Sequence, residues 1–405
     1  MASLAARLGP AAGARIALHC HDAYAFAVGL LAAGQVGTVA VLAPSRQPGA
    51  LQRLAGDVMG FVLDGPHPPE GEGIEGRPCW SPLEGPRVHA ELRPLDREAP
   101  WAELFTSGTT GAEKPVVKRV RHLEDEVELL ETQFGAALGA DGRVLSTASP
   151  QHLYGLLFGV LWPLASSRPF LRTPVLHPEE LAPYMGRSED ADSRAGDAAG
   201  FVLASTPATL RRLADEPELA GRAAHCRAVF SSGGPLDARI ARRMADALGA
   251  PPFEVYGSTE TGGIAVRQQW RGDEAWQPLP GVFTEVDPDD GRLRVTSRFV
   301  SGGEPTGAGR ARLATGDRAE AIPGGGFRLL GRMDRVVKVA EKRLSLPDME
   351  DRLREHPAVA EAALVLVEGA VEPRVAAVVV PTREGHGVYA AGGRRALGRQ
   401  LTEHL

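Results

Sequence analysis

Short apolar runs and longer amphipathic segments alternate through most of residues 1–330. A short apolar run that ends in Ser, Gly or Pro predicts a buried strand, whereas apolar residues three and four positions apart predict a helix. We therefore expect strands at residues 36–42, 101–105, 144–147, 200–205, 228–232 and 253–255. We expect helices at residues 22–33, 122–138, 207–214 and 237–248. This alternation is typical of a layered α/β architecture, in which ligands bind at the ends of strands.

The carboxy-terminal part of the chain has its own pattern. A strand is expected at residues 326–330, followed by strands at 359–367 and 374–381 and a helix at 394–405. Residues 186–199 and 301–310 are polar and rich in charge or glycine, which predicts exposed loops.

Residues 23–45 carry no formal charge and are long enough to cross a bilayer as one helix. Glycines at positions 29, 34 and 37 interrupt this stretch, so we interpret it as a helix and a buried strand that ends at Pro44. The amino terminus lacks the basic, apolar and small-residue order of a secretory signal. We expect a cytoplasmic protein without a membrane span.

Length and charge narrow the class of protein. A chain of 405 residues predicts two or three soluble domains with substantial cores. The formal net charge of -6, with Lys and Arg spread along the chain, argues against a nucleic-acid partner. Cys20, Cys79 and Cys226 form no Cys-x-x-Cys pair, which favours a reducing compartment and argues against a structural zinc site.

The most informative segment runs from Leu104 to Lys114. Its two glycines permit a turn in which backbone N–H groups converge on an anion. Ser107, Thr109 and Thr110 supply hydroxyl donors, and the lysine supplies a positive charge. No glycine precedes this lysine and no Ser or Thr follows it, so the segment does not fit a P-loop NTPase. Taken alone, a segment of this kind is more often an ordinary turn.

Four further segments concentrate similar chemistry after predicted strands. Residues 255–263 surround Glu260, whose oxygens suit magnesium, and include Tyr256, whose ring can stack on a base. Residues 231–235 form a glycine-rich turn, and residues 313–317 place Asp317 after a tight turn. Residues 331–343 are dense in charge. Each of these segments alone could be an exposed turn or an edge strand.

In their order, these motifs resemble the adenylate-forming superfamily, which includes acyl-CoA synthetases, peptide-synthetase adenylation domains and luciferases. The resemblance runs from about Phe105 to Glu350. It implies a large layered α/β amino-terminal domain over residues 1–333 and a small, truncated α+β carboxy-terminal domain over 334–405, with Asp334 as the hinge. Residues 335–347 are most similar to ligases of bacterial aryl-polyene and xanthomonadin-type pigment clusters, which load an acyl carrier protein.

The resemblance also implies a role for each motif. Glu260 would hold magnesium, Tyr256 would stack on adenine, and Asp317 would bind the ribose hydroxyls with help from Arg332. Within the motif at residues 150–155, His152 would lie beside the substrate carboxylate, although a histidine alone is more often an ordinary interior or surface residue. The implied catalytic residues are Lys114, His152 and Glu260. The implied nucleotide-binding residues are Thr106, Ser107, Gly108, Thr109, Thr110, Gly111, Gly233, Gly234, Tyr256, Gly257, Ser258, Thr259, Asp317 and Arg332.

The implied reaction is the activation of a carboxylic acid by ATP and Mg2+. A carboxylate oxygen attacks the α-phosphorus, pyrophosphate leaves, and an acyl-adenylate remains. The thiol of coenzyme A or of a carrier protein's phosphopantetheine then captures the acyl group. An acyl carrier protein is therefore a possible partner, and the acid itself stays open between aryl and fatty acyl.

The sequence departs from the family pattern at three places, and these departures affect which of the family's residue roles apply here. The usual Pro-Lys-Gly is Glu113-Lys114-Pro115 here, and the glycine usually found after the hinge strand is Glu341. Only residues 335–405 follow the hinge, and they contain no match for the late adenylation lysine, so we expect that the chain has been trimmed. A nucleotide-binding module without catalysis is the alternative that these departures leave open. A luciferase-like oxygenase has no sequence feature of its own.

Overall fold

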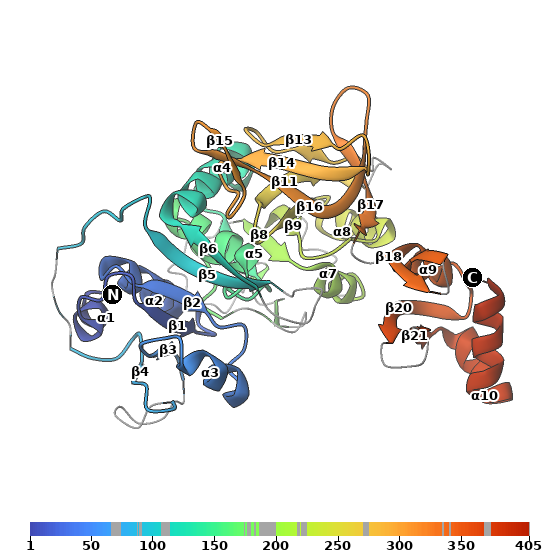
Figure 1. Ribbon diagram of the computed structural model, residues 1–405, viewed down its shortest axis with the longest axis horizontal. Coiled ribbons are helices and arrows are strands. Elements are labelled where there is room, and N and C mark those ends of the chain that lie inside the picture. The colour runs from blue at the N-terminus through green and yellow to red at the C-terminus, as the bar shows by residue number, and fades with distance from the viewer. Residues whose placement is uncertain are drawn as a thin grey trace. The chain divides into compact units, whose positions relative to one another are not determined.

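The computed structural model describes most of the chain (Figure 1). The described residues are 1–65, 74–86, 88, 91–106, 114–173, 175, 180–181, 184–185, 200–216, 219, 225–269, 275–333, 336–339, 342–367 and 374–404. They form two compact units, the first made of residues 1–284 and 295–313 and the second of residues 285–294 and 314–405. Several predicted features lie outside the described residues, namely the loop at 186–199, residues 107–111, Asp334 and Glu341. The predicted hinge and the boundary after residue 333 therefore stay predictions.

The first unit contains a six-stranded sheet near the amino terminus, in the order β4-β3-β1-β2-β5-β6. The strands from β4 to β5 are parallel, and β6 returns antiparallel to β5. Their bounds are β1 Arg15–His19, β2 Val39–Leu42, β3 Phe61–Leu63, β4 Cys79–Trp80, β5 Pro100–Thr106 and β6 Lys114–Arg119. Because β5 and β6 pair, Thr106 lies opposite Lys114.

A second six-stranded sheet of the first unit has the order β12-β11-β10-β9-β8-β7. Strands β7 to β10 are parallel, so their carboxyl ends meet at one edge. The bounds are β7 Arg143–Ser146, β8 Phe201–Ser205, β9 Cys226–Ser231, β10 Phe253–Ser258, β11 Gly262–Arg267 and β12 Gln277–Pro278. The motifs at residues 231–235 and 255–263 both follow strands of this edge.

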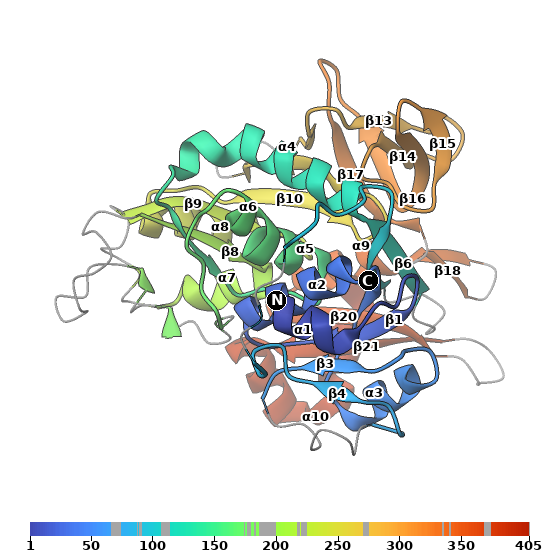
Figure 2. The same ribbon diagram turned by 90° about the vertical axis from the view of Figure 1, so that its left-hand side faces the viewer.

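Helices cover both faces of each sheet in the first unit (Figures 1 and 2). One core joins α2, α4 and the helices after β7 to both sheets, a second packs α7 and α8 on the far face of the second sheet, and a third packs α3 on the first sheet. The bounds are α1 Ala2–Leu8, α2 Ala23–Gln35, α3 Pro48–Ala55, α4 Val120–Leu138, α5 Leu153–Leu156, the π-helix η1 Leu157–Leu161, α6 Trp162–Ala165, α7 Pro207–Leu213 and α8 Ala238–Leu248. The layers therefore alternate as αβαβα, which agrees with the layered α/β architecture expected from the sequence.

Aromatic side chains fill the layer between α4, η1 and the second sheet. Phe230 on β9 is fully buried, and its ring centroid lies 5.0 Å from that of Phe134, 5.1 Å from Phe158 and 5.7 Å from Trp162. Rings at these separations pack in edge-to-face or tilted pairs that add to the gain from burial. This layer fixes α4 against β9, and Figure 2 shows α4 running along the second sheet.

The second unit is a separate α+β assembly. Within it, residues 317–321 of β16 pair antiparallel with β17, and hairpins join β18 to β19 and β20 to β21. Helices α9 and α10 cover the β20–β21 hairpin through a small apolar core. The bounds are α9 Leu346–Arg354, α10 Arg383–His404, β16 Arg310–Ala321, β17 Phe327–Arg332, β18 Val336–Val339, β19 Lys342–Ser345, β20 Val359–Val367 and β21 Arg374–Pro381.

The remaining strands, β13 Phe283–Val286, β14 Arg292–Ser297 and β15 Glu304–Gly307, lie near the division between the units along the chain. Residues 301–310, expected to form only an exposed loop, therefore include a strand, which pairs with the start of β16. The predicted strand at 36–42 begins at residue 39, because Val36 caps α2 and Gly37 has a φ of +77°. Gly393, with a φ of +67°, is not helical and divides α10 into two helical parts, so the predicted last helix at 394–405 is the second part and the first part, from Arg383, was not predicted.

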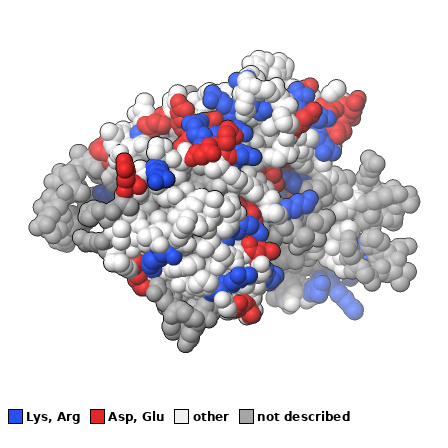
Figure 3. Space-filling view, turned by 60° about the vertical axis from the view of Figure 1, so that its left-hand side comes forward, with Lys and Arg blue, Asp and Glu red and all other residues white. Residues whose placement is uncertain are grey.

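No helix within the described part of the chain is long and apolar enough to cross a membrane. The uncharged stretch at residues 23–45 divides into α2 and β2, and the Asp22 carboxylate caps α2 by accepting the Ala25 N–H at 2.9 Å. On the face shown in Figure 3, basic and acidic side chains are interspersed, not gathered by sign.

We expect Phe230→Ala to lower the free energy of unfolding by about 3–5 kcal/mol, because it leaves a cavity in the aromatic layer. Urea unfolding followed by circular dichroism would measure the loss. Phe283 is 54% exposed, so Phe283→Ala serves as a control that should cost less than about 1 kcal/mol. Equal losses in the two variants would contradict the packing described above.

Candidate nucleotide-binding site

The described ends of the predicted phosphate loop lie side by side. Thr106 ends β5 and Lys114 begins β6, and the Thr106 hydroxyl donates to the Lys114 carbonyl oxygen at 3.4 Å. The Lys114 side chain is exposed, so its ammonium group is available to an anion. The antiparallel pairing of β5 and β6 therefore closes the loop at its base.

The turn that carries Glu260 joins β10 to β11. The predicted strand at 253–255 continues through Ser258, with a bulge at Tyr256 and Gly257. A Cβ on Gly257 would lie 2.3 Å from the Gly262 carbonyl oxygen, so only glycine lets the two strands approach here. The Ser258 N–H donates to the Thr261 hydroxyl at 3.0 Å and closes the turn. Gly257 thus has a structural role in addition to any contact with a nucleotide.

The Glu260 side chain is half-buried, whereas its backbone is firmly held. Its carbonyl oxygen accepts the Ser301 N–H at 2.8 Å and the Lys118 ammonium at 3.3 Å. Within the described residues, its carboxylate makes no hydrogen bond or ion pair. No group of three or more His, Cys, Asp or Glu residues in this part of the chain could hold a metal by itself. One uncommitted carboxylate suits Mg2+, which usually takes one or two carboxylates together with phosphate oxygens and water.

Two buried charged residues lie beneath this turn, and sequence reasoning missed them. Lys118 on β6 is fully buried, and its ammonium donates to the Phe299 carbonyl oxygen at 2.8 Å. Glu126 on α4 is 3% exposed and accepts the Gly263 N–H at 2.6 Å. Burial lowers the pKa of Lys118 to about 8 and raises the pKa of Glu126, while each charge partly offsets the shift of the other.

The sequence does contain a signal for this pair. Strand alternation places Val116 and Lys118 at the buried positions of β6. Helical spacing places Glu126 on the same buried face as Leu123 and Leu130. A charged residue at an inward position of a strand, followed by another at an inward position of the next helix, would have identified the pair.

The Tyr256 ring packs on a neighbouring aromatic ring, which is itself held by an ion-paired arginine. Its ring centroid lies 5.4 Å from that of Trp276, and the Arg267 guanidinium lies 4.4 Å from the Trp276 ring. Arg267 in turn donates to both carboxylate oxygens of the buried Glu254, at 3.0 and 2.9 Å. The bidentate pair fixes the guanidinium plane, which suits a stacked support for an aromatic platform.

The glycine-rich turn after β9 lies beside β10. The Ser232 hydroxyl donates to the Val255 carbonyl oxygen at 2.8 Å and ties the turn to the neighbouring strand. Gly233 has a φ of +88°, and a Cβ built on it would meet no atom within 4 Å. Gly233 and Gly234 are both exposed, so their backbone is open to a flat ring.

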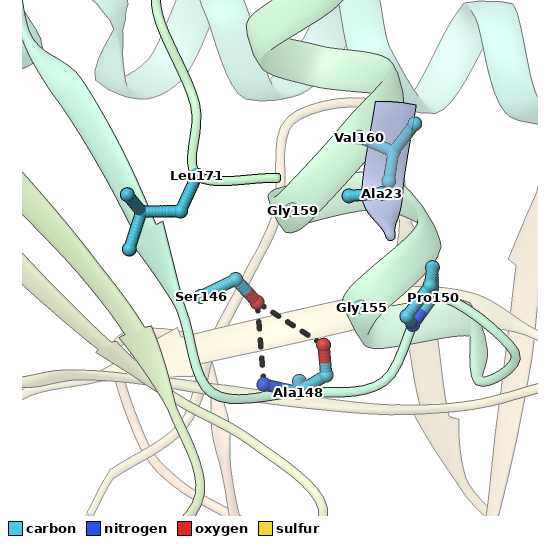
Figure 4. A pocket seen from close by; sticks show the side chains of 8 residues that line it. All are labelled: Ala23, Ser146, Ala148, Pro150, Gly155, Gly159, Val160 and Leu171. Atoms are coloured by element: carbon cyan, nitrogen blue, oxygen red, sulfur yellow. Dashed lines mark hydrogen bonds between the residues drawn. The ribbon is translucent and has the colours of Figure 1, made fainter. Parts of the chain in front are cut away.

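His152 lies at the N-cap position of α5 and is exposed, and partial desolvation lowers the pKa of its imidazole. The segment before α5 borders a small pocket (Figure 4). The pocket is lined by Ala23, Ser146, Ala148, Pro150, Gly155, Gly159, Val160 and Leu171. The Ser146 hydroxyl is engaged with the backbone of Ala148 at 3.2 Å, which leaves an apolar lining. The adjoining π-helix widens the turn that bears Gly159 and Val160.

Asp317 and Arg332 lie together in the second unit. They are direct partners across β16 and β17, and the Arg332 guanidinium is 3.8 Å from the Asp317 carboxylate. A Cβ on Gly316 would lie 2.9 Å from that guanidinium, so glycine makes room for it. The two residues are thus brought together as a local pair, while Lys114, Glu260 and Tyr256 belong to the first unit.

The fold is that of solved adenylate-forming structures. The chain matches ATP-bound MatB from Rhodopseudomonas palustris with a TM-score of 0.76 at 22% identity, over 96% of this chain and 84% of that one. It matches a benzoate CoA ligase from Burkholderia xenovorans LB400 with a TM-score of 0.72 at 20% identity, over 100% and 86% of the two chains. The predicted fold class, a large α/β domain followed by a small domain, is confirmed.

The sequence is similar to curated ligases as well. It is 30% identical to a 4-coumarate--CoA ligase of Cereibacter sphaeroides over 64% of this chain and 55% of that protein. It is 25% identical to a 4-chlorobenzoate--CoA ligase of Arthrobacter sp over 70% of this chain and 57% of that protein. The chain thus spans little more than half the length of these relatives.

Fold and sequence together define a mixed α/β protein with the fold of the adenylate-forming enzymes. The pattern of the AMP-binding enzyme family matches residues 47–295, more than half of the chain. The chain belongs to the AMP-binding enzyme family, and the resemblance stated from its motifs is confirmed at that level.

The buried His122 should make the first unit sensitive to acid. Burial, then Lys118, Arg121 and Arg119, lower the pKa of His122 from 6.5 to about 3. Between these values the unfolded chain binds a proton that the folded chain does not, so the free energy of unfolding falls as the pH falls. We expect His122→Asn, which keeps an acceptor for the Arg119 N–H, to flatten this dependence between pH 6.5 and 3.

Urea unfolding across that pH range would measure the effect. The exposed His386 provides a control, and His386→Asn should leave the pH dependence unchanged. An unchanged slope in His122→Asn would contradict the assignment of a neutral buried imidazole.

Proposed function

We propose that this protein activates a carboxylic acid with ATP and Mg2+ as an acyl-adenylate and then transfers the acyl group to a thiol. The main support is the half-buried Glu260 carboxylate, which lies on a turn held by backbone hydrogen bonds and makes no hydrogen bond or ion pair of its own with the described residues. In a member of the AMP-binding enzyme family, such a carboxylate suits the magnesium ion of a nucleotide.

The proposed chemistry needs positioning and charge neutralisation, and it needs no protein nucleophile. When the carboxylate oxygen attacks the α-phosphorus, negative charge builds on the phosphate oxygens and on the leaving pyrophosphate. Lys114 and the hydroxyl-bearing loop from Thr106 would donate to those oxygens, and magnesium held by Glu260 would neutralise them. Tyr256, Gly233 and Gly234 would hold the adenine.

His152 would meet the acid substrate. Because desolvation lowers the pKa of its imidazole, His152 would be neutral at pH 7 and would offer a hydrogen bond without adding charge. Two of the relatives act, by name, on 4-coumarate and 4-chlorobenzoate, which supports an aryl acid as a candidate substrate.

The thiol acceptor is coenzyme A or the phosphopantetheine of an acyl carrier protein. The names of the relatives favour coenzyme A, whereas the hinge-region sequence at residues 335–347 favours a carrier protein. Parallel assays with each thiol and the same acid would distinguish the two acceptors.

The proposed reaction predicts acid-dependent exchange of labelled pyrophosphate into ATP. We expect exchange with a panel of aryl acids, and we expect Glu260→Gln to reduce it about 10- to 150-fold, because a charge-assisted contact contributes about 1.5–3 kcal/mol. Glu128 is exposed on α4, so Glu128→Gln is a matched control that should retain full exchange. Tight ATP binding without exchange for any acid would favour a nucleotide-binding module without catalysis.

We expect Asp317→Ala to raise the KM for ATP about 10- to 150-fold by removing the acceptor for the ribose hydroxyls. The KM for the acid should change little, since Asp317 is not proposed to contact it. Steady-state pyrophosphate release at varied ATP would measure both constants. Asp290, an exposed turn residue of the same unit, supplies the control Asp290→Ala. An ATP KM unchanged in Asp317→Ala would show that the ribose assignment is wrong.

A further inference from the structure

Two buried side chains, each with an ionisable group, form hydrogen bonds to the turn that carries Glu260, one from each side. From the β6 side, the Lys118 ammonium donates to the carbonyl oxygens of Glu260 and Phe299, at 3.3 and 2.8 Å. From the α4 side, Glu126 accepts the Gly263 N–H at 2.6 Å. Both ends of the turn are therefore held by hydrogen bonds to a charged partner, and such bonds are stronger than neutral ones.

Two glycines of the turn allow its backbone to pass close to the Glu126 carboxylate. Gly262 has a φ of +69°, and a Cβ on it would lie 2.7 Å from Glu126 Oε2. A Cβ on Gly263 would lie 3.3 Å from Glu126 Oε1. The backbone passes directly over the carboxylate, so a shift of Glu126 would move the turn.

Strand β6 connects the Lys118 hydrogen bonds to the phosphate loop, which is the other part of the candidate nucleotide site. Lys114 begins the strand at the exit of the phosphate loop, and Lys118 lies two alternations later. The loop proposed to bind the phosphates and the turn proposed to bind their magnesium are therefore attached to the same short strand.

We propose that Lys118 and Glu126 are positioning residues that hold the Glu260 turn in the conformation that binds magnesium, a role that rests on the proposed function of Glu260. Neither residue touches the nucleotide. Their removal should raise the magnesium requirement of ATP binding and leave the binding of metal-free nucleotide unchanged.

The test is calorimetric titration of ATP into the full chain at a series of Mg2+ concentrations, with AMP in EDTA as the metal-free probe. In Lys118→Met, we expect the Mg2+ concentration for half-maximal ATP binding to rise about tenfold, the loss of roughly one charge-assisted hydrogen bond. In Glu126→Gln, which keeps an acceptor for the Gly263 N–H, we expect a smaller rise. The affinity for AMP in EDTA should change less than about twofold.

A single substitution leaves the other charge buried without its partner and can therefore unfold the protein. The double variant Lys118→Met/Glu126→Gln removes both charges together and still lacks the Lys118 hydrogen bonds, so the same rise is expected. Glu128→Gln is the matched control on the same helix, because Glu128 is exposed and lies away from the Glu260 turn. This control should leave the magnesium requirement unchanged.

Two results would overturn the inference. One is an unchanged magnesium requirement in the double variant, and the other is an equal loss of AMP binding, which would mark a general effect on folding. Glu260→Gln separates this inference from the proposed function. If Glu260→Gln raises the requirement and the Lys118 and Glu126 variants do not, only the positioning role fails. If Glu260→Gln also has no effect, the magnesium assignment itself is wrong.

Discussion

A buried ammonium group joins the two sheets of the first unit at the point where the candidate site lies. Lys118 belongs to the first sheet, whereas the carbonyl oxygen of Glu260 lies at the end of a strand of the second. Burying an isolated charge is strongly unfavourable, and the position is tolerated because two carbonyl oxygens and the nearby Glu126 compensate the ammonium. Elsewhere the sheets are joined by apolar packing across α2, α4 and η1. At the candidate site, hydrogen bonds from Lys118 join the sheets instead. Because hydrogen bonds are directional, they restrict the relative position of the two sheets more than apolar contacts do.

The glycines of the site serve two constraints at once. Gly257 and Gly262 allow the backbones of β10 and β11 to approach each other and Glu126, at distances that no Cβ permits. Gly233, in contrast, has a positive φ and open space around it. A glycine-rich motif therefore does not by itself mark the residues that contact a ligand. Here the glycines nearest Glu260 are required by packing, and those after β9 leave room for a ring.

The sequence predicted the elements that depend on local pattern. The parallel strands β7 to β10 of the second sheet and helices α4, α7 and α8 were placed within two or three residues, because their apolar periodicity is strong, whereas β11 and β12 were not predicted. The errors occurred where tertiary contacts override local preference, as at strand β15 and the first half of α10, which sequence reasoning missed. The motifs gave the positions of Glu260 and Asp317. The motifs do not include Lys118 and Glu126. Strand and helix periodicity place both residues at inward positions, but their contacts with a turn more than a hundred residues away cannot be read from the sequence.

The two lysines of β6 show how one residue type can serve two physical roles. Lys114 is exposed at the start of the strand, where a long flexible side chain can follow a phosphate as charge moves during a reaction. Lys118 is buried four residues later, where packing removes that flexibility and the ammonium becomes a fixed part of the scaffold. A reaction that relies on positioning needs both kinds of charge, since a mobile cation can neutralise an oxyanion only if the groups around it keep their places. Lys114, which pairs with Thr106 at the base of the phosphate loop, and Lys118, which donates to the Glu260 turn, both belong to strand β6. The geometry of this one strand therefore sets both the base of the phosphate loop and the position of the candidate metal ligand.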